Sequence, residues 1–277
     1  MKNEIIESDF DFRPLEIAPV LAKAKKLQND RIYRDKKALF FAEGVRNFVQ
    51  AVDQGFSIDT LIYSEKLLIS SMARKLVRRL KRAGVAFTRL SPEQFRSISQ
   101  TERASGVAAI FRQHTQKLDE IKPGGHTCWT VLSEIRSPGN LGTLIRTSAA
   151  IGASGFILLG DSIDPFDPNI VRASMGAIFK QSIARASPSD LRAWIKSHNL
   201  QAIGAAPNGS LNYNQVAYNH PTILMLGNER SGLTKDQESM CQKIVRIPMA
   251  NGMDSLNVAI AGSLLLYEVF RSVELHC

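Results

Sequence analysis

Residues 222–232 read Thr-Ile-Leu-Met-Leu-Gly-Asn-Glu-Arg-Ser-Gly, an apolar run that changes at once into a polar, glycine-containing one. The run predicts a strand over residues 222–226 with a loop at its carboxyl end. Two more polar, glycine-containing segments follow expected strands: Ser-Pro-Gly-Asn-Leu-Gly at residues 137–142 and Ile-Pro-Met-Ala-Asn-Gly-Met-Asp-Ser-Leu-Asn at residues 247–257. In open α/β sheets ligands bind outside the carboxyl ends of the strands. We therefore expect the three loops to converge on one ligand site.

Expected strands alternate with expected helices on both sides of these loops. The strands are expected at residues 39–42, 58–63, 85–90, 106–111, 128–135, 155–160, 178–184, 200–205, 222–226 and 243–247. In the C-terminal part the alternation predicts a mostly parallel sheet with helices on both faces, ending in a long helix at residues 255–273. In the N-terminal part it predicts a small layer of about four strands with helices. The predicted fold class is therefore α/β.

The chain has 277 residues, which suggests two domains, and 44% of them are hydrophobic, which excludes a disordered or fibrous protein. Its net charge of +9 is unevenly distributed. Residues 1–116 carry 21 Lys and Arg against 13 Asp and Glu, whereas the remainder carries 14 against 13. We predict a basic N-terminal domain at residues 1–116 that binds nucleic acid, a linker at residues 117–126 and a nearly neutral C-terminal domain at residues 127–277.

Positive charge is densest in an expected helix at residues 71–83. Met72, Leu76 and Leu80 would form its apolar face, while the other faces carry six basic residues and no acidic one. Such a run is most simply a solvated surface, but like charges one turn apart repel, and a phosphate backbone would relieve that repulsion. A membrane surface fits less well because the apolar face lacks Trp and Phe anchors. The candidate contacts to RNA in this helix are Arg74, Lys75, Arg78 and Arg79.

Several other classes of protein lack their signatures in this sequence. The 3 Cys and 5 His residues are scattered without metal-ligand or CxxC spacing, so we expect no metal site and no disulfide framework. No dinucleotide fingerprint follows the first strand, and the P-loop and nucleophile-elbow motifs are absent. Because the sequence shows neither a signal peptide nor an apolar stretch long enough to span a membrane, we predict a cytoplasmic protein.

Taken together, the three loops resemble the signature motifs of the SpoU/TrmH class of SPOUT RNA methyltransferases. The pattern Asn-x-Gly-x-x-x-Arg matches Asn140, Gly142 and Arg146. The pattern Gly-x-Glu-x-x-Gly-Leu matches Gly227, Glu229, Gly232 and Leu233. The pattern Ile-Pro-Met … Ser-Leu-Asn-Val matches residues 247–249 and 255–258, and residues 172–176 resemble the family's Arg-Ala-Ser-x-Gly segment. The resemblance covers residues 128–272. More loosely, residues 41–63 and 105–107 resemble the family's substrate-binding domain, which is similar to ribosomal protein L30e.

The resemblance implies properties that spacing and composition do not show. The C-terminal domain would be a SPOUT domain whose end is threaded into a deep trefoil knot, and the N-terminal domain would be L30e-like. The cofactor would be S-adenosylmethionine, and the protein would act as a homodimer with its sites at the interface. The expected product is a 2′-O-methylated ribose in RNA, and the separate basic domain favours rRNA over tRNA by analogy with the family.

The resemblance also implies roles for individual residues. Arg146 would orient the substrate and stabilise developing negative charge, since a guanidinium does not deprotonate readily. Asn140, Glu229, Ser255 and Asn257 would position the ribose and the catalytic loop, with Asn257 fixing Asn140 or Arg146 by a hydrogen bond. The cofactor would receive backbone contacts from Gly227, Ile247 and Leu256, and Leu226 and Met249 would form apolar walls. Arg172 would bind RNA or hold its own loop.

Three alternatives stay open at this point. The enzyme could methylate the ribose of tRNA instead of rRNA, or it could methylate a base. A non-catalytic RNA-binding or ribosome-assembly factor on the same scaffold is the third, and the intact residues of all three motifs argue against it.

Overall fold

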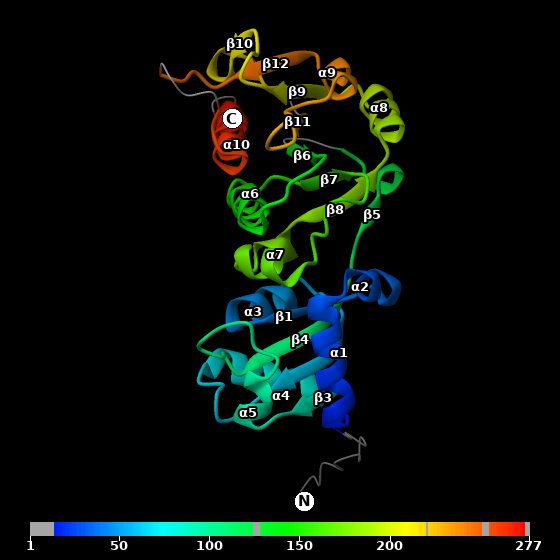
Figure 1. Cartoon of the computed structure of the whole chain (residues 1–277), viewed down its shortest axis with the longest axis vertical. Coiled ribbons are helices and arrows are strands. Elements are labelled where there is room, and N and C mark those ends of the chain that lie inside the picture. The colour runs from blue at the N-terminus through cyan, green and yellow to red at the C-terminus, as the bar shows by residue number, and fades with distance from the viewer. Residues whose placement is uncertain (1–13, 124–127, 220, 251–254, 275–277) are drawn as a thin grey trace, which may run out of the picture. The chain divides into compact units, whose positions relative to one another are not determined.

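The structure is a computed structural model that describes residues 14–123, 128–219, 221–250 and 255–274 (Figure 1). The chain divides into two compact units, Met1–Gln113 and His114–Cys277. Residues at the expected end of the first domain and in the expected linker form β5 (Gln116–Lys117) and the short 3-10 helix η1 (Leu118–Glu120), and β5 pairs with a strand of the second unit. Residues 124–126 of the expected linker lie outside the described part.

The first unit is built on a four-stranded sheet with the order β1-β4-β2-β3. Its strands are β1 (Leu39–Glu43), β2 (Ile58–Tyr63), β3 (Phe87–Arg89) and β4 (Val107–Arg112). Strand β4 is antiparallel to both β1 and β2, while β2 and β3 are parallel. Its helices are α1 (Ile17–Asn29), α2 (Arg31–Lys37), α3 (Val45–Asp53), α4 (Ser71–Arg82) and α5 (Pro92–Arg96). The expected small α/β layer is thus present.

Helices cover this sheet because its strands bury side chains on both faces. Val20, Ala24 and Leu27 of α1 share one core cluster with Phe41 and Ile110 of the sheet. These strand residues alternate with neighbours that point to the opposite face, where the rings of Phe40 and Phe111 pack with centroids 5.6 Å apart.

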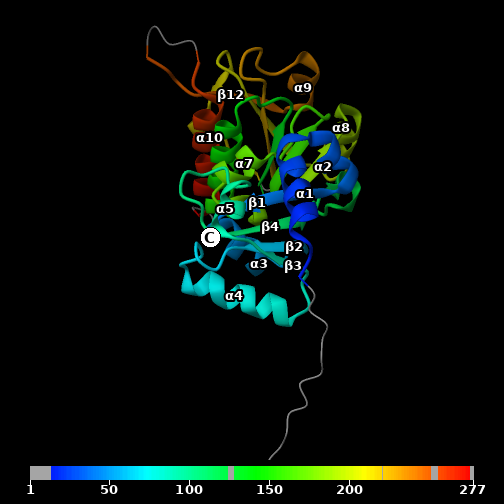
Figure 2. The ribbon, with the colours of Figure 1, turned by 60° about the horizontal axis from the view of Figure 1, so that its bottom comes forward.

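Helix α4 packs through an apolar face that overlaps the expected one, with Leu76 buried and Leu80 half-buried. Ser70 caps it by accepting a hydrogen bond from the Ala73 backbone N–H at 3.3 Å. Ala73, Leu76 and Val77 are buried, whereas Met72 is 54% exposed. The prediction was wrong for Met72, because the helix turns Ala73 and Val77 inward beside Leu76 and leaves Met72 on its exposed side. The helix lies along the edge of the first unit, as Figure 2 shows.

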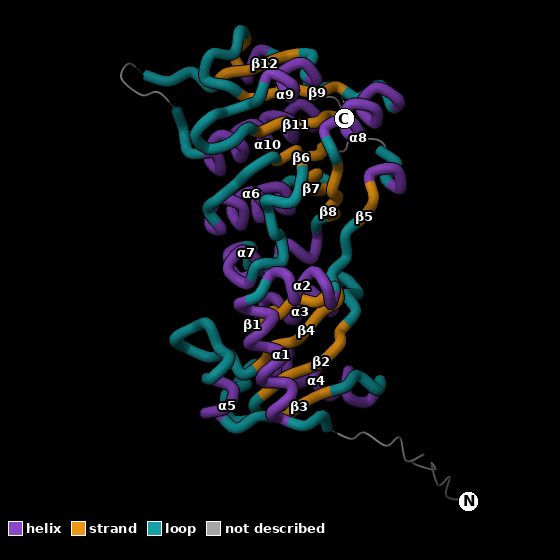
Figure 3. Tube along the Cα trace, turned by 45° about the vertical axis from the view of Figure 1, so that its right-hand side comes forward, coloured by secondary structure: helices purple, strands orange, loops and turns teal. Residues whose placement is uncertain are grey.

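The second unit contains one sheet of eight parallel strands, which confirms the expected mostly parallel sheet (Figure 3). The order is β10-β12-β9-β11-β6-β7-β8-β5. The strands besides β5 are β6 (Cys128–Leu132), β7 (Gly155–Leu159), β8 (Ser182–Ala186), β9 (Gln201–Ala205), β10 (Leu211–Asn212), β11 (Thr222–Leu226) and β12 (Lys243–Arg246). The strand expected at residues 178–184 begins later, because Ala177–Lys180 forms the 3-10 helix η2. Ile178 and Phe179 of η2 are buried, so the sequence has the apolar character of a strand there.

Helices cover both faces of the large sheet, as expected. On one face α6 (Pro138–Ala150) packs against α7 (Pro168–Ala173) and α10 (Val258–Glu274), while α8 (Pro188–Ser197) and α9 (Lys235–Met240) lie together on the other (Figure 1). The indole rings of Trp129 and Trp194 meet edge to face in the core beneath α8, with centroids 6.5 Å apart. Among the helices that the structure describes, none is both long and apolar enough to cross a membrane. The trefoil knot stays a prediction.

The register of the central strands brings their carboxyl ends to one level. Leu226, the last residue of β11, lies opposite Leu132 of β6 and Ala205 of β9. Ala205 in turn lies opposite Val245 of β12. The loops that follow these four strands therefore start side by side, and the site described below is built on them.

A close contact between α6 and α7 depends on Gly142. A Cβ atom at this position would lie 2.4 Å from the Cβ of Ala173 and 2.8 Å from its carbonyl carbon. We predict that Gly142→Ala lowers the free energy of unfolding of the second unit by about 1–3 kcal/mol, because the two helices must move apart. Urea unfolding followed by tryptophan fluorescence measures this, since both tryptophans lie in the second unit.

The matched control is Gly139→Ala in the first turn of the same helix. A Cβ there would meet only Ser137 Oγ, at 3.7 Å. This variant should unfold within about 1 kcal/mol of the wild type, on the stabilising side, because alanine favours a helix over glycine. Equal stability of the two variants would contradict the packing explanation.

Candidate active site at the carboxyl ends of the strands

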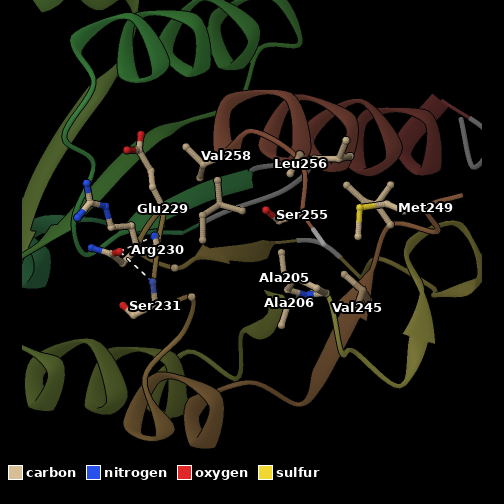
Figure 4. Close-up of a pocket in the computed structure, with 17 residues that line it drawn as sticks. Ala205, Ala206, Glu229, Arg230, Ser231, Val245, Met249, Ser255, Leu256 and Val258 are labelled. Atoms are coloured by element: carbon tan, nitrogen blue, oxygen red, sulfur yellow. Dashed lines mark hydrogen bonds between the residues drawn. The ribbon is translucent and has the colours of Figure 1, made fainter. Parts of the chain in front are cut away.

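A cavity of about 320 Å³ lies where β9, β11 and β12 end and α10 begins. Figure 4 shows the side chains that surround it. The lining residues are Ala205, Ala206, Pro207, Leu226, Gly227, Asn228, Glu229, Arg230, Ser231, Gly232, Val245, Ile247, Met249, Ser255, Leu256, Val258 and Ala261. The second and third of the polar segments identified in the sequence thus meet at one place. Residues 251–254 of the third segment lie outside the described part.

One wall of the cavity is a tight turn that closes on itself. The backbone groups of Asn228 and Gly232 exchange two hydrogen bonds of 2.9 and 3.0 Å. A Cβ on Gly227 would lie 2.1 Å from the carbonyl carbon of Gly232, so only glycine fits at position 227. Gly232 has a φ of +70°, a conformation that favours glycine. The glycine spacing of the second motif therefore follows from the shape of this turn.

The opposite walls are mostly apolar. Leu226 is fully buried at the end of β11, and Met249, Leu256 and Val258 are half-buried around the cavity. In Figure 4 Glu229 and Arg230 lie at one end of the cavity and Met249 at the other. All residues predicted to bind the cofactor line this cavity, namely Leu226, Gly227, Ile247, Met249 and Leu256.

A chain of hydrogen bonds joins the three motif segments at the polar end. Asn257 Nδ2 donates to Asn140 Oδ1 at 3.1 Å, and Asn140 Nδ2 donates to Glu229 Oε1 at 2.5 Å. The Oδ1 atom of Asn257 also accepts from the backbone N–H groups of Ala259 and Ile260 at 2.9 and 3.3 Å, which caps the start of α10. The structure therefore brings Asn140, Glu229 and Asn257 into contact, and Ser255 lies in the same cavity lining.

Arg146 is placed differently from the other predicted catalytic residues. It lies six residues after Asn140 on α6, which turns it roughly 240° around the helix axis. It is exposed on the same helix side as Thr143 and Ala150, and it does not line the cavity. Among the residues that the structure describes, it has no hydrogen-bond or ion-pair partner. A single copy of the chain therefore gathers four of the five predicted catalytic residues.

The predicted RNA-contacting residues are exposed, and some of their side chains are hydrogen-bonded within the protein. Lys75, Arg78 and Arg79 are exposed on α4. The Nε atom of Arg74 donates to the carbonyl oxygen of Leu68 at 2.5 Å, so this side chain also holds the loop before the helix. The candidate Arg172 on α7 is exposed as well, and its Nη2 atom donates to the side-chain oxygen of a residue on the same helix at 3.4 Å.

The structure adds cavity residues that the sequence did not indicate. Ala205 ends β9 and Ala206 and Pro207 follow it; β9 carries no motif, and the place of these residues is set by the position of β9 between β11 and β12. Asn228 lies within the second motif at a variable position and bonds to Glu134 after β6. Adjacency of strands in the sheet, which a single sequence does not reveal, is the signal that would have found these residues.

The structure also bears on cysteine nucleophiles and on metal binding. Burial raises the pKa of the Cys128 and Cys241 thiols to about 12, so neither is a thiolate nucleophile near neutral pH. Within the described ranges, no group of three or more His, Cys, Asp or Glu residues is placed to hold a metal ion.

Comparison with known proteins agrees with this arrangement. The model of the SpoU rRNA Methylase family matches residues 128–267, and that of the MRM3-like substrate binding domain matches residues 19–109. The 23S rRNA (uridine(2479)-2′-O)-methyltransferase of Streptomyces viridochromogenes is 30% identical over 252 residues, which cover 88% of this chain and 87% of that protein.

Solved structures are similar over nearly the whole chain. An AdoMet-bound rRNA methyltransferase from Sinorhizobium meliloti has a TM-score of 0.84 at 32% identity, covering 94% of this chain and 97% of that one. The SpoU methyltransferase AviRb from Streptomyces viridochromogenes, in complex with AdoMet, has a TM-score of 0.82 at 28% identity, covering 92% and 98%. With both units matched and its motifs gathered around one cavity, the chain belongs to the SpoU rRNA methylase family.

Proposed function

We propose that the protein transfers a methyl group from S-adenosylmethionine to a ribose 2′-hydroxyl of rRNA. The observation that carries the proposal is the cavity, which the second and third motifs line and to whose rim Asn140 of the first motif is hydrogen-bonded. The family is named for rRNA methylation, and the Streptomyces relative is named for 2′-O-methylation of 23S rRNA. An rRNA substrate also agrees with the cytoplasmic location expected from the sequence.

The cavity suits S-adenosylmethionine as the cofactor. Its volume falls within the roughly 300–1,000 Å³ typical of small-molecule sites. Leu226, Met249 and Leu256 supply apolar walls, while the closed turn at residues 227–232 supplies a polar, glycine-containing wall. Two of the similar solved structures contain AdoMet. When bound, S-adenosylmethionine supplies a methyl group activated by the sulfonium.

The residues around the cavity have to position the 2′-hydroxyl within about 3–3.5 Å of the methyl carbon and stabilise the charge it develops. Asn257 fixes Asn140, and Asn140 fixes the Glu229 carboxylate, so the three present one ordered polar edge. We assign ribose positioning to these residues and to Ser255. We assign substrate orientation and charge stabilisation to Arg146, since a guanidinium group is poorly suited to act as a base.

We assign RNA capture to the N-terminal domain. Its family model is a substrate-binding domain, and residues 21–116 carry 19 Lys and Arg against 8 Asp and Glu. Lys75, Arg78 and Arg79 offer an exposed basic face on α4. Arg172 on α7 is a further contact within the catalytic domain. This division separates capture of the RNA backbone from the chemistry in the nearly neutral C-terminal domain.

We further propose that the protein is a homodimer through α10. Ile260, Leu264 and Tyr267 are spaced by four and three residues along this helix, and they are 51%, 39% and 54% exposed. Such an apolar stripe favours burial against another protein surface. A second copy could also complete the site, because Arg146 is not among the residues that line the cavity of its own chain.

We predict that Arg146→Ala lowers methyl transfer at least ~100-fold, because the developing charge loses its stabilisation. Affinity for S-adenosylmethionine should stay within a factor of two of the wild type, since Arg146 does not line the cavity. The measurement is methyl transfer to rRNA from a deletion strain, with 2′-O-methylated positions mapped, and calorimetry for the cofactor. Lys196→Ala on α8 is the matched control and should leave both unchanged. Methylation found only in tRNA, or only on a base, would overturn the proposed substrate.

We predict that Lys75→Gln/Arg78→Gln/Arg79→Gln weakens rRNA binding and flattens its salt dependence by roughly 0.7–0.9 in log–log slope for each phosphate that the variant no longer neutralises. Cofactor affinity should not change. Arg74 is left intact because it holds the loop before α4. Filter binding at several salt concentrations measures the effect, with Lys122→Gln/Lys196→Gln/Lys235→Gln as a control of equal charge. An unchanged salt slope would remove α4 from the RNA interface.

We predict that Leu264→Glu/Tyr267→Glu shifts the protein from dimer to monomer in sedimentation, because two carboxylates would be buried at the interface. Methyl transfer should fall together with dimerisation. The control is Ile32→Glu/Ile69→Glu, which alters two isoleucines of the first unit that are 80% and 85% exposed. A wild-type protein that sediments as a 30.6 kDa monomer would refute the proposed dimer.

A further inference from the structure

We propose that Glu134 and Asn228 form a positioning pair that sets the shape of the cofactor-binding turn. This inference rests on the assignment of the cavity as the S-adenosylmethionine site. The two residues come from loops after neighbouring strands, Glu134 after β6 and Asn228 after β11. Neither occupies a fixed position of the three motifs. Their role is inferred from the contacts that follow.

Both polar atoms of the Asn228 side chain, Oδ1 and Nδ2, make hydrogen bonds. Its Oδ1 atom accepts from the backbone N–H groups of Arg230 at 2.7 Å and of Ser231 at 3.1 Å (Figure 4). Its Nδ2 atom donates to Oε2 of Glu134. The oxygen thus organises the turn from within, while the nitrogen anchors the turn to the loop after β6.

The Glu134 carboxylate selects the orientation of this amide. An asparagine side chain can be rotated so that its oxygen and nitrogen exchange places, and only one of the two orientations can accept from two backbone N–H groups. A carboxylate accepts hydrogen bonds and cannot donate them, so it favours the orientation in which Nδ2 faces Glu134 and Oδ1 faces the turn. The other oxygen of Glu134 accepts from Arg136 Nη2 at 3.3 Å, which holds the carboxylate in place.

The anchor matters because the turn lines the cavity along its whole length. Every residue from 227 to 232 contributes to the lining. The next residue, Glu229, is itself bonded to Asn140 on α6. Two consecutive residues of the turn are therefore tied to two points of the segment that follows β6. Without the hydrogen bond from Asn228 to Glu134, the turn could change shape even while the hydrogen bond between Glu229 and Asn140 remained.

Reversing the polarity of the pair tests the proposal. In Asn228→Asp the new carboxylate still accepts from the turn but faces the carboxylate of Glu134, so the two repel. We expect the dissociation constant for S-adenosylmethionine to rise at least about tenfold, measured by calorimetry on the full-length protein. Glu134→Gln keeps an acceptor and should change it less than threefold. The double variant Asn228→Asp/Glu134→Gln restores one donor facing one acceptor, keeps the wild-type net charge, and should return affinity to within threefold.

Further variants separate this role from charge and from folding. Asn214→Asp, at an exposed position in the 3-10 helix η3 (Tyr213–Gln215), adds the same charge elsewhere and should leave affinity unchanged. Tryptophan fluorescence of the cofactor-free variants should show wild-type unfolding midpoints. If Asn228→Asp does not fold, Glu134→Ala removes the acceptor alone and should weaken binding about threefold or more.

The outcomes separate the pair from the function on which it rests. Wild-type affinity in Asn228→Asp, or a double variant as weak as Asn228→Asp, overturns the positioning pair while leaving the cofactor assignment intact. A wild-type protein that binds no S-adenosylmethionine overturns both.

Discussion

The in-register parallel pairing of β12, β9, β11 and β6 is the constraint on which the site depends. Because the carboxyl ends of these strands lie within one residue of the same level, four loops far apart in sequence begin at one edge of the sheet. Close helix packing keeps that edge in place: a Cβ on Gly262 of α10 would lie 2.6 Å from Leu144 of α6 and 2.7 Å from Leu226. The cavity is thus a property of the sheet and of the helices pressed against it, and the motif residues occupy positions that this packing has already defined.

Much of this arrangement could be predicted from residue patterns. The apolar run at residues 222–226 is a central strand, and the loop expected after it is the tight turn that contains Gly227 and Gly232. Sequence patterns did not predict short elements that form only through contacts with other parts of the chain. The two-residue strands β5 and β10 have no period of their own and exist only by pairing with neighbours. The sequence pattern indicated no helix at residues 31–37, yet they form α2, in which Arg34 is buried and donates to the carbonyl oxygen of Leu27 at 2.7 Å.

For the site residues too, the sequence indicated which residues matter, and the structure was needed to show how they are arranged. Local motifs indicated Asn140, Glu229 and Asn257, and the hydrogen bonds among them join segments more than eighty residues apart in the chain. Such bonds require knowledge of which strands are neighbours. Arg146 shows the converse, since its motif position indicated function while the residue is exposed on α6 and does not line the cavity of its own chain. Composition located the basic character in the first domain, but it did not reveal that Arg74 is partly engaged by the backbone at Leu68.

The closed turn at residues 227–232 has a consequence for how tightly a ligand can bind. A loop that becomes ordered only when a ligand arrives loses conformational entropy at that moment, and the loss weakens binding. Here the backbone pairing between Asn228 and Gly232 forms within the chain itself. The cost of ordering these residues is met when the protein folds. Preorganisation of this kind leaves more of the contact energy with the adenosyl group available as affinity.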